Sequence, residues 1–263
     1  MESLQDINPV ERALVNKATA NRTPINATIE LTPTCNFRCD MCYIRMEKSQ
    51  AEKRGGLRSI EEWLHIADQL QEIGTLFILL TGGEPLLYPD FKELYIRLKE
   101  KGFILTINTN ATLIDDETVR LFQRLKPRRV NVSLYGVTNG TYLNLCHATN
   151  GFDRCLEGLK RLKEYGIDTR YLVFEITESA YTENPGQIIA TVEQLRTLGF
   201  VIEMDDFGNG YSSLNTLSEL PIDVLKIDLE FLRMRKNVVR RKQIMRFVIN
   251  LANELRLQVI AEG

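Results

Sequence analysis

The sequence lacks the long apolar runs and the excess of one charge that mark membrane and nucleic-acid-binding proteins. Apolar stretches such as "LFILL" at residues 76–80 are far shorter than the ~20 residues needed to span a bilayer. The net charge of −2 gives no electrostatic attraction to nucleic acid or to an anionic membrane. The acidic, polar start "MESLQDINPVER" does not resemble a secretory signal. These absences predict a cytoplasmic protein with neither nucleic acid nor membrane as a partner.

Cysteine is scarce and unevenly placed. There are five cysteines, an odd number, and three of them, Cys35, Cys39 and Cys42, fall within eight positions. Such a set does not suit a disulfide framework and favours a metal or cluster in a reducing compartment. A C-x3-C-x2-C loop can give three thiolates to an iron–sulfur cluster; a zinc site lacking one ligand and chance clustering are the alternatives. Cys146 and Cys155 lack this spacing, and we expect them to be structural.

Helical and strand periods alternate along nearly the whole sequence. Four times an amphipathic segment reaches a glycine and then passes into a short apolar run, as in "LKEKG" before "FILTINTN". Glycine suits the left-handed residue that ends a helix. The four glycines are Gly74, Gly102, Gly166 and Gly199. Ser59, with Glu62 three residues later, has the pattern of a capping box at a helix start. This alternation predicts a parallel sheet with crossover helices.

The number of strands predicts the fold class, an α/β fold with a single closed (β/α)8 TIM-like barrel, which typically needs ~250 residues. The expected strands are residues 26–33, 75–82, 103–109, 129–135, 170–177, 201–206, 223–229 and 258–262. A helix at residues 9–20 is expected to cover the barrel through one apolar face, made of Val10, Leu14, Val15 and Ala18. The expected organisation is one structural domain, with a helical extension (1–25) and two half-barrels (26–169 and 170–263).

Chemistry in such a barrel sits where the strands end, at their carboxyl termini. The first expected strand ends at the cysteine loop, the second in "TGGEP", the third in "NTNATL" and the fourth in "NVSLYG". Two adjacent glycines let a ligand approach the backbone, and Glu84 places a carboxylate at the mouth. Taken alone, "TGGEP" is as well explained by an ordinary turn.

These four motifs, in this order, resemble the radical S-adenosylmethionine (radical SAM) family over residues 21–167, most of all its branch acting on peptides and proteins. The resemblance implies a [4Fe-4S] cluster on Cys35, Cys39 and Cys42, and reductive cleavage of SAM to a 5′-deoxyadenosyl radical. It also implies that SAM is held by a second set of residues: Gly82, Gly83, Glu84, Asn110 and Ser133. Met41 and Ala111 depart from the family, where an aromatic residue and a glycine are common. The partners implied are the small-molecule cofactor and a peptide substrate.

Beyond residue 171 the resemblance changes. "LVFEITES", "DDFGNGYSSL", "LPIDVLKID" and "VIAEG" are similar to the C-terminal half of EAL-family cyclic di-GMP phosphodiesterases, over residues 171–263. That resemblance implies a divalent-metal site on Glu175, Asp205 and Asp206, and it gives catalytic roles to Lys226 and Glu262. Paired carboxylates suit hard cations such as Mg²⁺ or Mn²⁺.

The sequence lacks two motifs that the EAL resemblance requires, the E-x-L glutamate of the first strand and the asparagine of the second. The metal site is therefore expected to be degenerate, with weak Mg²⁺ or Mn²⁺ binding and no phosphodiesterase activity. Three functions remain open. The first is cluster and SAM binding with reductive SAM cleavage. The second is an inactive hybrid barrel scaffold of natural or engineered origin, and the third is a degenerate cyclic di-GMP phosphodiesterase or binder.

Overall fold

The computed structural model describes residues 9–177, 185–207, 214–227 and 238–261. Helices and strands alternate along the described chain in an α/β fold, and its eight strands follow one another in sequence order. Contacts divide the chain into two compact units. We call them the cysteine unit (the described residues up to Ser133, with Thr138–Leu172) and the carboxylate unit (Leu134–Val137 and the described residues from Val173 onward).

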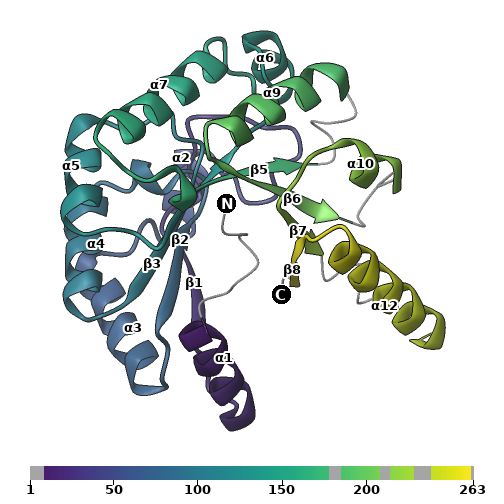
Figure 1. The fold of residues 1–263 in the computed structure, drawn as a ribbon. Helices are drawn as coiled ribbons and strands as arrows, with labels where there is room; N and C mark the ends of the chain where they lie inside the picture. The colour runs from purple at the N-terminus through teal and green to yellow at the C-terminus, as the bar shows by residue number, and fades with distance from the viewer. Residues whose placement is uncertain (1–8, 178–184, 208–213, 228–237, 262–263) are drawn as a thin grey trace. The chain divides into compact units, whose positions relative to one another are not determined.

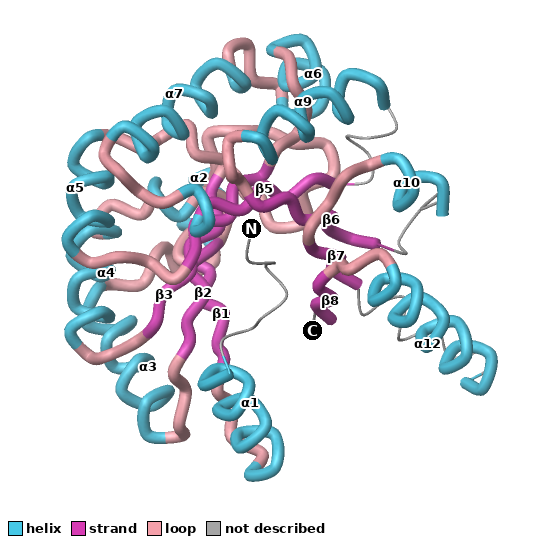
Figure 2. Tube along the Cα trace, viewed as in Figure 1, coloured by secondary structure: helices cyan, strands magenta, loops and turns pink. Residues whose placement is uncertain are grey.

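The cysteine unit holds four parallel strands: β1 (Asn26–Glu30), β2 (Phe77–Thr81), β3 (Ile104–Thr109) and β4 (Arg129–Ser133). Helices α3, α4, α5 and α7 lie along one side of these strands (Figure 1). The helical elements of the unit are α1 (Pro9–Asn21), α2 (Lys48–Lys53), α3 (Ile60–Glu72), η1 (Pro85–Leu87), α4 (Phe91–Glu100), α5 (Asp116–Arg124), α6 (Asn139–Cys146), α7 (Gly151–Glu164) and η2 (Thr169–Tyr171). A long loop joins β1 to α2 (Figure 2), and it carries the three clustered cysteines.

Local sequence signals account for the ends of these helices. Ser59 Oγ accepts a hydrogen bond from the Glu62 amide at 3.2 Å, and Glu62 Oε2 accepts one from the Ser59 amide at 2.8 Å. The expected capping box is confirmed. All four expected helix-ending glycines have positive φ, with values of 93°, 90°, 74° and 88° along the chain. Residues other than glycine rarely adopt this backbone conformation, so these glycines end each helix and turn the chain toward the next strand.

The carboxylate unit holds the other four strands, which are parallel: β5 (Leu172–Thr177), β6 (Val201–Phe207), β7 (Val224–Ile227) and β8 (Gln258–Ala261). Its helices are α9 (Pro185–Thr197), α10 (Leu214–Glu219) and α12 (Val238–Glu254). Val173, Val201 and Val224 form a buried layer on these strands, with Ile260 packed against it. The register between β6 and β7 shifts between Met204 and Phe207, where β6 carries its acidic residues.

The parallel α/β architecture and the positions of the strands agree with expectation, with shifts at the ends. β1 stops at Glu30, before the predicted end at residue 33; Pro33 has no N–H with which to extend the ladder. The expectation for the first helix is wrong in one respect. Of its apolar face only Ala18 is buried, whereas Val10, Leu14 and Val15 are exposed. Closure into one barrel and the division into half-barrels stay predictions. Among the described helices, none is both long and apolar enough to cross a membrane.

Candidate functional site

The three clustered cysteines lie on the loop that follows β1. Cys35 and Cys39 are half-buried, and Cys42 is exposed. Backbone amides point at two of the sulfurs: Phe37 N–H donates to Cys35 Sγ at 3.3 Å and Arg45 N–H to Cys42 Sγ at 3.4 Å. Burial raises the pKa of the Cys35 thiol to about 11, against the lowering effect of the Phe37 amide. Amide donors of this kind stabilise sulfur that carries negative charge, as cluster ligands do.

The "GGE" motif at the end of β2 is joined to the start of the cysteine loop through the backbone. Gly83 N–H donates to the Thr32 carbonyl at 2.7 Å, and Glu84 N–H donates to the Thr34 carbonyl at 3.0 Å. A Cβ atom on either Gly82 or Gly83 would lie less than 3.0 Å from one of these carbonyl oxygens. The sequence suggested that the glycines admit a ligand. In the structure the group that approaches them is the cysteine loop itself.

Glu84 is fully buried, and its carboxylate joins the ends of β2 and β3. Oε1 accepts from the Thr109 hydroxyl at 2.8 Å and from the Leu86 amide at 3.1 Å, while Oε2 accepts from the Asn110 amide at 2.8 Å. Burial raises the pKa of Glu84 to about 7, and the three donors partly oppose this rise. The role of Glu84 in holding SAM stays a prediction.

A network of amides and hydroxyls connects the end of β3 to Cys35. Asn110 Nδ2 donates to Asn36 Oδ1 at 2.9 Å and lies 3.8 Å from Cys35 Sγ. Asn36 Nδ2 donates to Thr112 Oγ1 at 2.7 Å, and that hydroxyl donates to Asn110 Oδ1 at 2.7 Å. The sequence predicted Asn110 but missed Asn36 and Thr112, although Asn36 lies within the cysteine motif and Thr112 within "NTNATL". Ser133, the last predicted residue of this group, is the half-buried end of β4.

A fourth thiol lies against the cysteine loop. Cys146, the last residue of α6, is fully buried, and its side chain is in hydrogen-bonding contact with Cys39. This contact and burial raise the pKa of Cys146 far above its usual range. Cys155 lies in α7, and burial raises the pKa of its thiol to about 12. Sequence spacing gave no signal for Cys146, because the contact joins residues that are far apart in the chain.

The carboxylate unit gathers four charged side chains. Lys226 Nζ on β7 lies 3.0 Å from Asp205 Oδ1, and 3.5 Å from both Glu175 Oε1 and Glu203 Oε1. Glu175, Glu203 and Lys226 are buried. The sequence missed Glu203, although it is two residues from Asp205 and so points to the same face of β6. Asp206 belongs to β6 but its side chain is outside the described part of the structure, as is the whole of Glu262.

Comparison with known proteins decides the family. Residues 29–195 match the radical SAM superfamily. The chain belongs to that superfamily. The solved structure of SuiB of Streptococcus suis matches 97% of this chain and 54% of its own chain, with a TM-score of 0.59 at 22% identity, which is a likeness of fold.

Relatives of two kinds confirm the mixed resemblance expected from the sequence. AlbA of Bacillus subtilis, an antilisterial bacteriocin subtilosin biosynthesis protein, is 30% identical over 71% of this chain. The cyclic di-GMP phosphodiesterase NbdA of Pseudomonas aeruginosa is 37% identical over 46% of it. The chain spans only 41% of the length of AlbA and 16% of that of NbdA.

The donor set of the cysteine loop fits the cluster that the radical SAM family implies. It offers three thiols on one loop, two of them with amide donors at the sulfur. In the described part of the chain, no three Cys, His, Asp or Glu side chains are gathered closely enough to hold a single metal ion. In the carboxylate unit the positive charge among the acids is the Lys226 ammonium.

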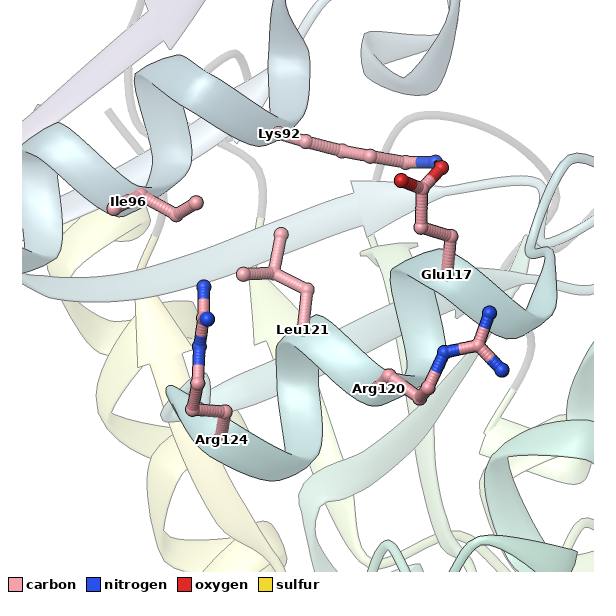
Figure 3. Close-up of a pocket in the computed structure, with 6 residues that line it drawn as sticks. All are labelled: Lys92, Ile96, Glu117, Arg120, Leu121 and Arg124. Atoms are coloured by element: carbon pink, nitrogen blue, oxygen red, sulfur yellow. Dashed lines mark hydrogen bonds and ion pairs between the residues drawn. The ribbon is translucent and has the colours of Figure 1, made fainter.

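A surface pocket of about 320 Å³ lies between α4 and α5 (Figure 3). Its lining combines a Lys92–Glu117 ion pair with two arginines one helical turn apart and two aliphatic side chains. The lining residues are Lys92, Ile96, Glu117, Arg120, Leu121 and Arg124. None of them belongs to a predicted motif, so this pocket gives no support to the radical SAM site.

Proposed function

We propose that the chain binds a [4Fe-4S] cluster through Cys35, Cys39 and Cys42, and binds SAM beside it. When bound, the cluster would supply the electron for reductive cleavage of SAM to methionine and a 5′-deoxyadenosyl radical. The observation that carries the proposal is the joining of three predicted motifs at neighbouring strand ends. "GGE" is hydrogen-bonded to the cysteine loop, Glu84 holds Asn110, and Asn110 reaches Cys35.

Residues of this chain would then have distinct tasks. The amides of Phe37 and Arg45 stabilise thiolate charge at the loop, and the Asn110–Asn36 pair orients Cys35. We assign Gly82, Gly83, Glu84, Asn110 and Ser133 to SAM by resemblance. The substrate class we propose is a peptide. Its support is the bacteriocin-biosynthesis relative AlbA, and a structural neighbour, SuiB, that was solved with its precursor peptide.

A second candidate is a barrel scaffold that takes up a cluster but does not cleave SAM. It is favoured by the resemblance of residues 171–263 to EAL phosphodiesterases, and a cyclic di-GMP phosphodiesterase, NbdA, is among the relatives of this chain. Cyclic di-GMP hydrolysis itself is not proposed. Lys226 lies among Glu175, Glu203 and Asp205 and offsets part of their negative charge.

Anaerobic reconstitution with iron and sulfide tests the proposal. We expect absorbance near about 400 nm with matching iron and sulfide contents, which is typical of thiolate-held clusters. Replacing Cys35, Cys39 and Cys42 with Ala should abolish iron binding, whereas Cys155→Ala, which changes a buried thiol elsewhere, should retain it. Reduction in the presence of SAM should then release 5′-deoxyadenosine and methionine. A full cluster in the triple variant would refute the ligand assignment, and a cluster without SAM cleavage would support the scaffold.

A further inference from the structure

The cysteine loop is fastened to the end of α6 on both sides of Cys39. Arg38 N–H donates to the Cys146 carbonyl at 2.9 Å, and Asp40 N–H donates to the Leu145 carbonyl at 3.0 Å. These two bonds hold residues more than a hundred positions apart in the chain against each other. They account for the contact between the side chains of Cys39 and Cys146.

A third contact closes the same junction. His147 Nε2 lies 2.8 Å from Asp40 Oδ1. His147 follows Cys146 directly and ends α6 with φ 51°, the left-handed conformation common where helices end. The last turn of α6 and the middle of the cysteine loop are therefore positioned as one piece.

The two thiols have unequal access to solvent. Cys39 is half-buried, whereas Cys146 has no exposed surface. A small reagent can reach the first sulfur but not the second, so an oxidation that consumes both must begin at Cys39. Disulfides join Cα atoms about 4.4–6.8 Å apart. The two backbone hydrogen bonds, from Arg38 to Cys146 and from Asp40 to Leu145, hold Cys39 beside Cys146 before any oxidation takes place.

We propose that Cys39 and Cys146 are a redox modification site, forming a reversible disulfide with a low-molecular-weight disulfide as oxidant. The Cys39 thiolate attacks one sulfur of the oxidant, so the oxidant's S–S bond breaks and one small thiol leaves. Cys146 Sγ then attacks Cys39 Sγ and displaces the second small thiol, and the Cys146 proton passes to that leaving group in the same step. The two protein thiols lose two electrons and two protons, and the oxidant gains them as two thiols. An excess of reducing thiol reverses both steps.

The disulfide would also control the proposed cluster site. A sulfur in a disulfide cannot act as a thiolate ligand, so oxidation leaves the loop with Cys35 and Cys42 alone. This consequence rests on the proposed function, whereas formation of the disulfide does not. The oxidised chain would be protected from irreversible oxidation of Cys39 and would load a cluster only after reduction.

Peptide mapping of the cluster-free wild-type chain tests the disulfide. The chain is incubated with oxidised glutathione, blocked with an alkylating agent and digested without reductant. Trypsin should give a cross-link between fragments 39–45 and 130–154, which excludes Cys35. Digestion before aspartate should give one between fragments 6–39 and 116–152, which excludes Cys42. The two digests together identify Cys39 and Cys146.

Two variants provide matched controls. Cys146→Ser should lose the cross-link and retain glutathione on the 39–45 fragment, whereas Cys155→Ser, at an equally buried thiol, should form the cross-link as the wild type does. Cross-links confined to the three loop cysteines, or Cys146 fully alkylated after denaturation of the oxidised chain, would overturn the proposal. Both outcomes are read on the wild-type chain, so they hold even where a variant fails to fold.

A second measurement separates this proposal from the proposed function. Oxidised wild type should bind almost no iron on reconstitution, and reduction beforehand should restore the full amount. A chain that forms the cross-link but binds no iron in either state would refute the cluster and leave the disulfide standing. A chain that binds a cluster equally well before and after oxidation would overturn the disulfide and leave the cluster standing.

Discussion

Glu175 and Glu203 are register partners on the neighbouring strands β5 and β6, and each has a carboxylate oxygen 3.5 Å from Lys226 Nζ. Two carboxylates placed side by side on a sheet repel each other. Only 7% and 3% of their side-chain surfaces are exposed, so water screens this repulsion poorly. The Lys226 ammonium, which also lies 3.0 Å from Asp205 Oδ1, offsets this repulsion.

Replacing Lys226 with Met should therefore destabilise the carboxylate unit strongly. Removal of one partner from a buried ion pair typically costs about 3–5 kcal/mol, because the remaining charge is left uncompensated. The free energy of unfolding, measured in denaturant together with hydrogen exchange of the β5–β7 amides, should fall by this order. Lys242→Met changes an exposed lysine of the same unit and should alter the free energy by less than about 0.5 kcal/mol. Equal effects of the two changes would show that Lys226 does not hold the acids together.

The packing of α7 on the loop after β3 depends on Gly158. A Cβ atom at this position would lie less than 3.0 Å from the Ala111 carbonyl oxygen, and this is backbone that cannot rotate away. Gly158→Ala should lower the free energy of unfolding by about 1–3 kcal/mol, as overpacking does.

The matched control for this change is Gly186→Ala in α9. Among the described atoms, none lies within 4 Å of a Cβ built there, and the residue is exposed. Alanine favours a helix over glycine by up to about 1 kcal/mol, so a small gain or no change is expected. If both variants unfold at the same denaturant concentration as wild type, the prediction is wrong: α7 can then move away from the Ala111 carbonyl without loss of stability.

The cysteine unit should become less stable as the pH rises, because Glu84 holds its proton more tightly in the folded chain than in the unfolded chain. Its folded pKa, raised by burial from 4.5 to about 7, means that the folded chain keeps a proton which the unfolded chain has released. Between about pH 4.5 and 7 the free energy of unfolding therefore falls with increasing pH, by about 3 kcal/mol in all. Above pH 7 both states are ionised and this contribution is constant.

The measurement is the difference in the free energy of unfolding between wild type and Glu84→Gln across this range. Glutamine does not titrate, so contributions of all other groups cancel and the difference should change by about 3 kcal/mol. Parallel curves for the two proteins would mean that Glu84 is already ionised in the folded chain at pH 5.

The sequence predicted features that depend on residues close together in the chain, and it missed those that depend on residues far apart. Gly74 and the Ser59–Glu62 capping box act over a few residues, and their signals could be seen directly in the sequence. Glu203 was missed because its meaning depends on Lys226, one strand away. Cys146 was missed for a similar reason, since α6 meets the cysteine loop through contacts that no spacing rule encodes.

The network around Asn36 gives a last prediction, one that separates positioning of the cluster ligands from stability. Asn36 accepts from Asn110 and donates to Thr112, and it follows Cys35 directly. Asn36→Ala should remove both bonds, at a cost of about 1–3 kcal/mol in the free energy of unfolding.

Asn131→Ala is the matched change. Asn131 on β4 is also half-buried and donates to Asn108 Oδ1 at 2.9 Å, a bond between the neighbouring strands β3 and β4. Both variants should lose comparable stability. Only Asn36→Ala should also lose iron faster to a chelator after reconstitution, since loss of a group that positions a metal ligand typically changes metal affinity about 10–100-fold. Equal rates of iron release would show that the network supports the fold of the loop without orienting Cys35.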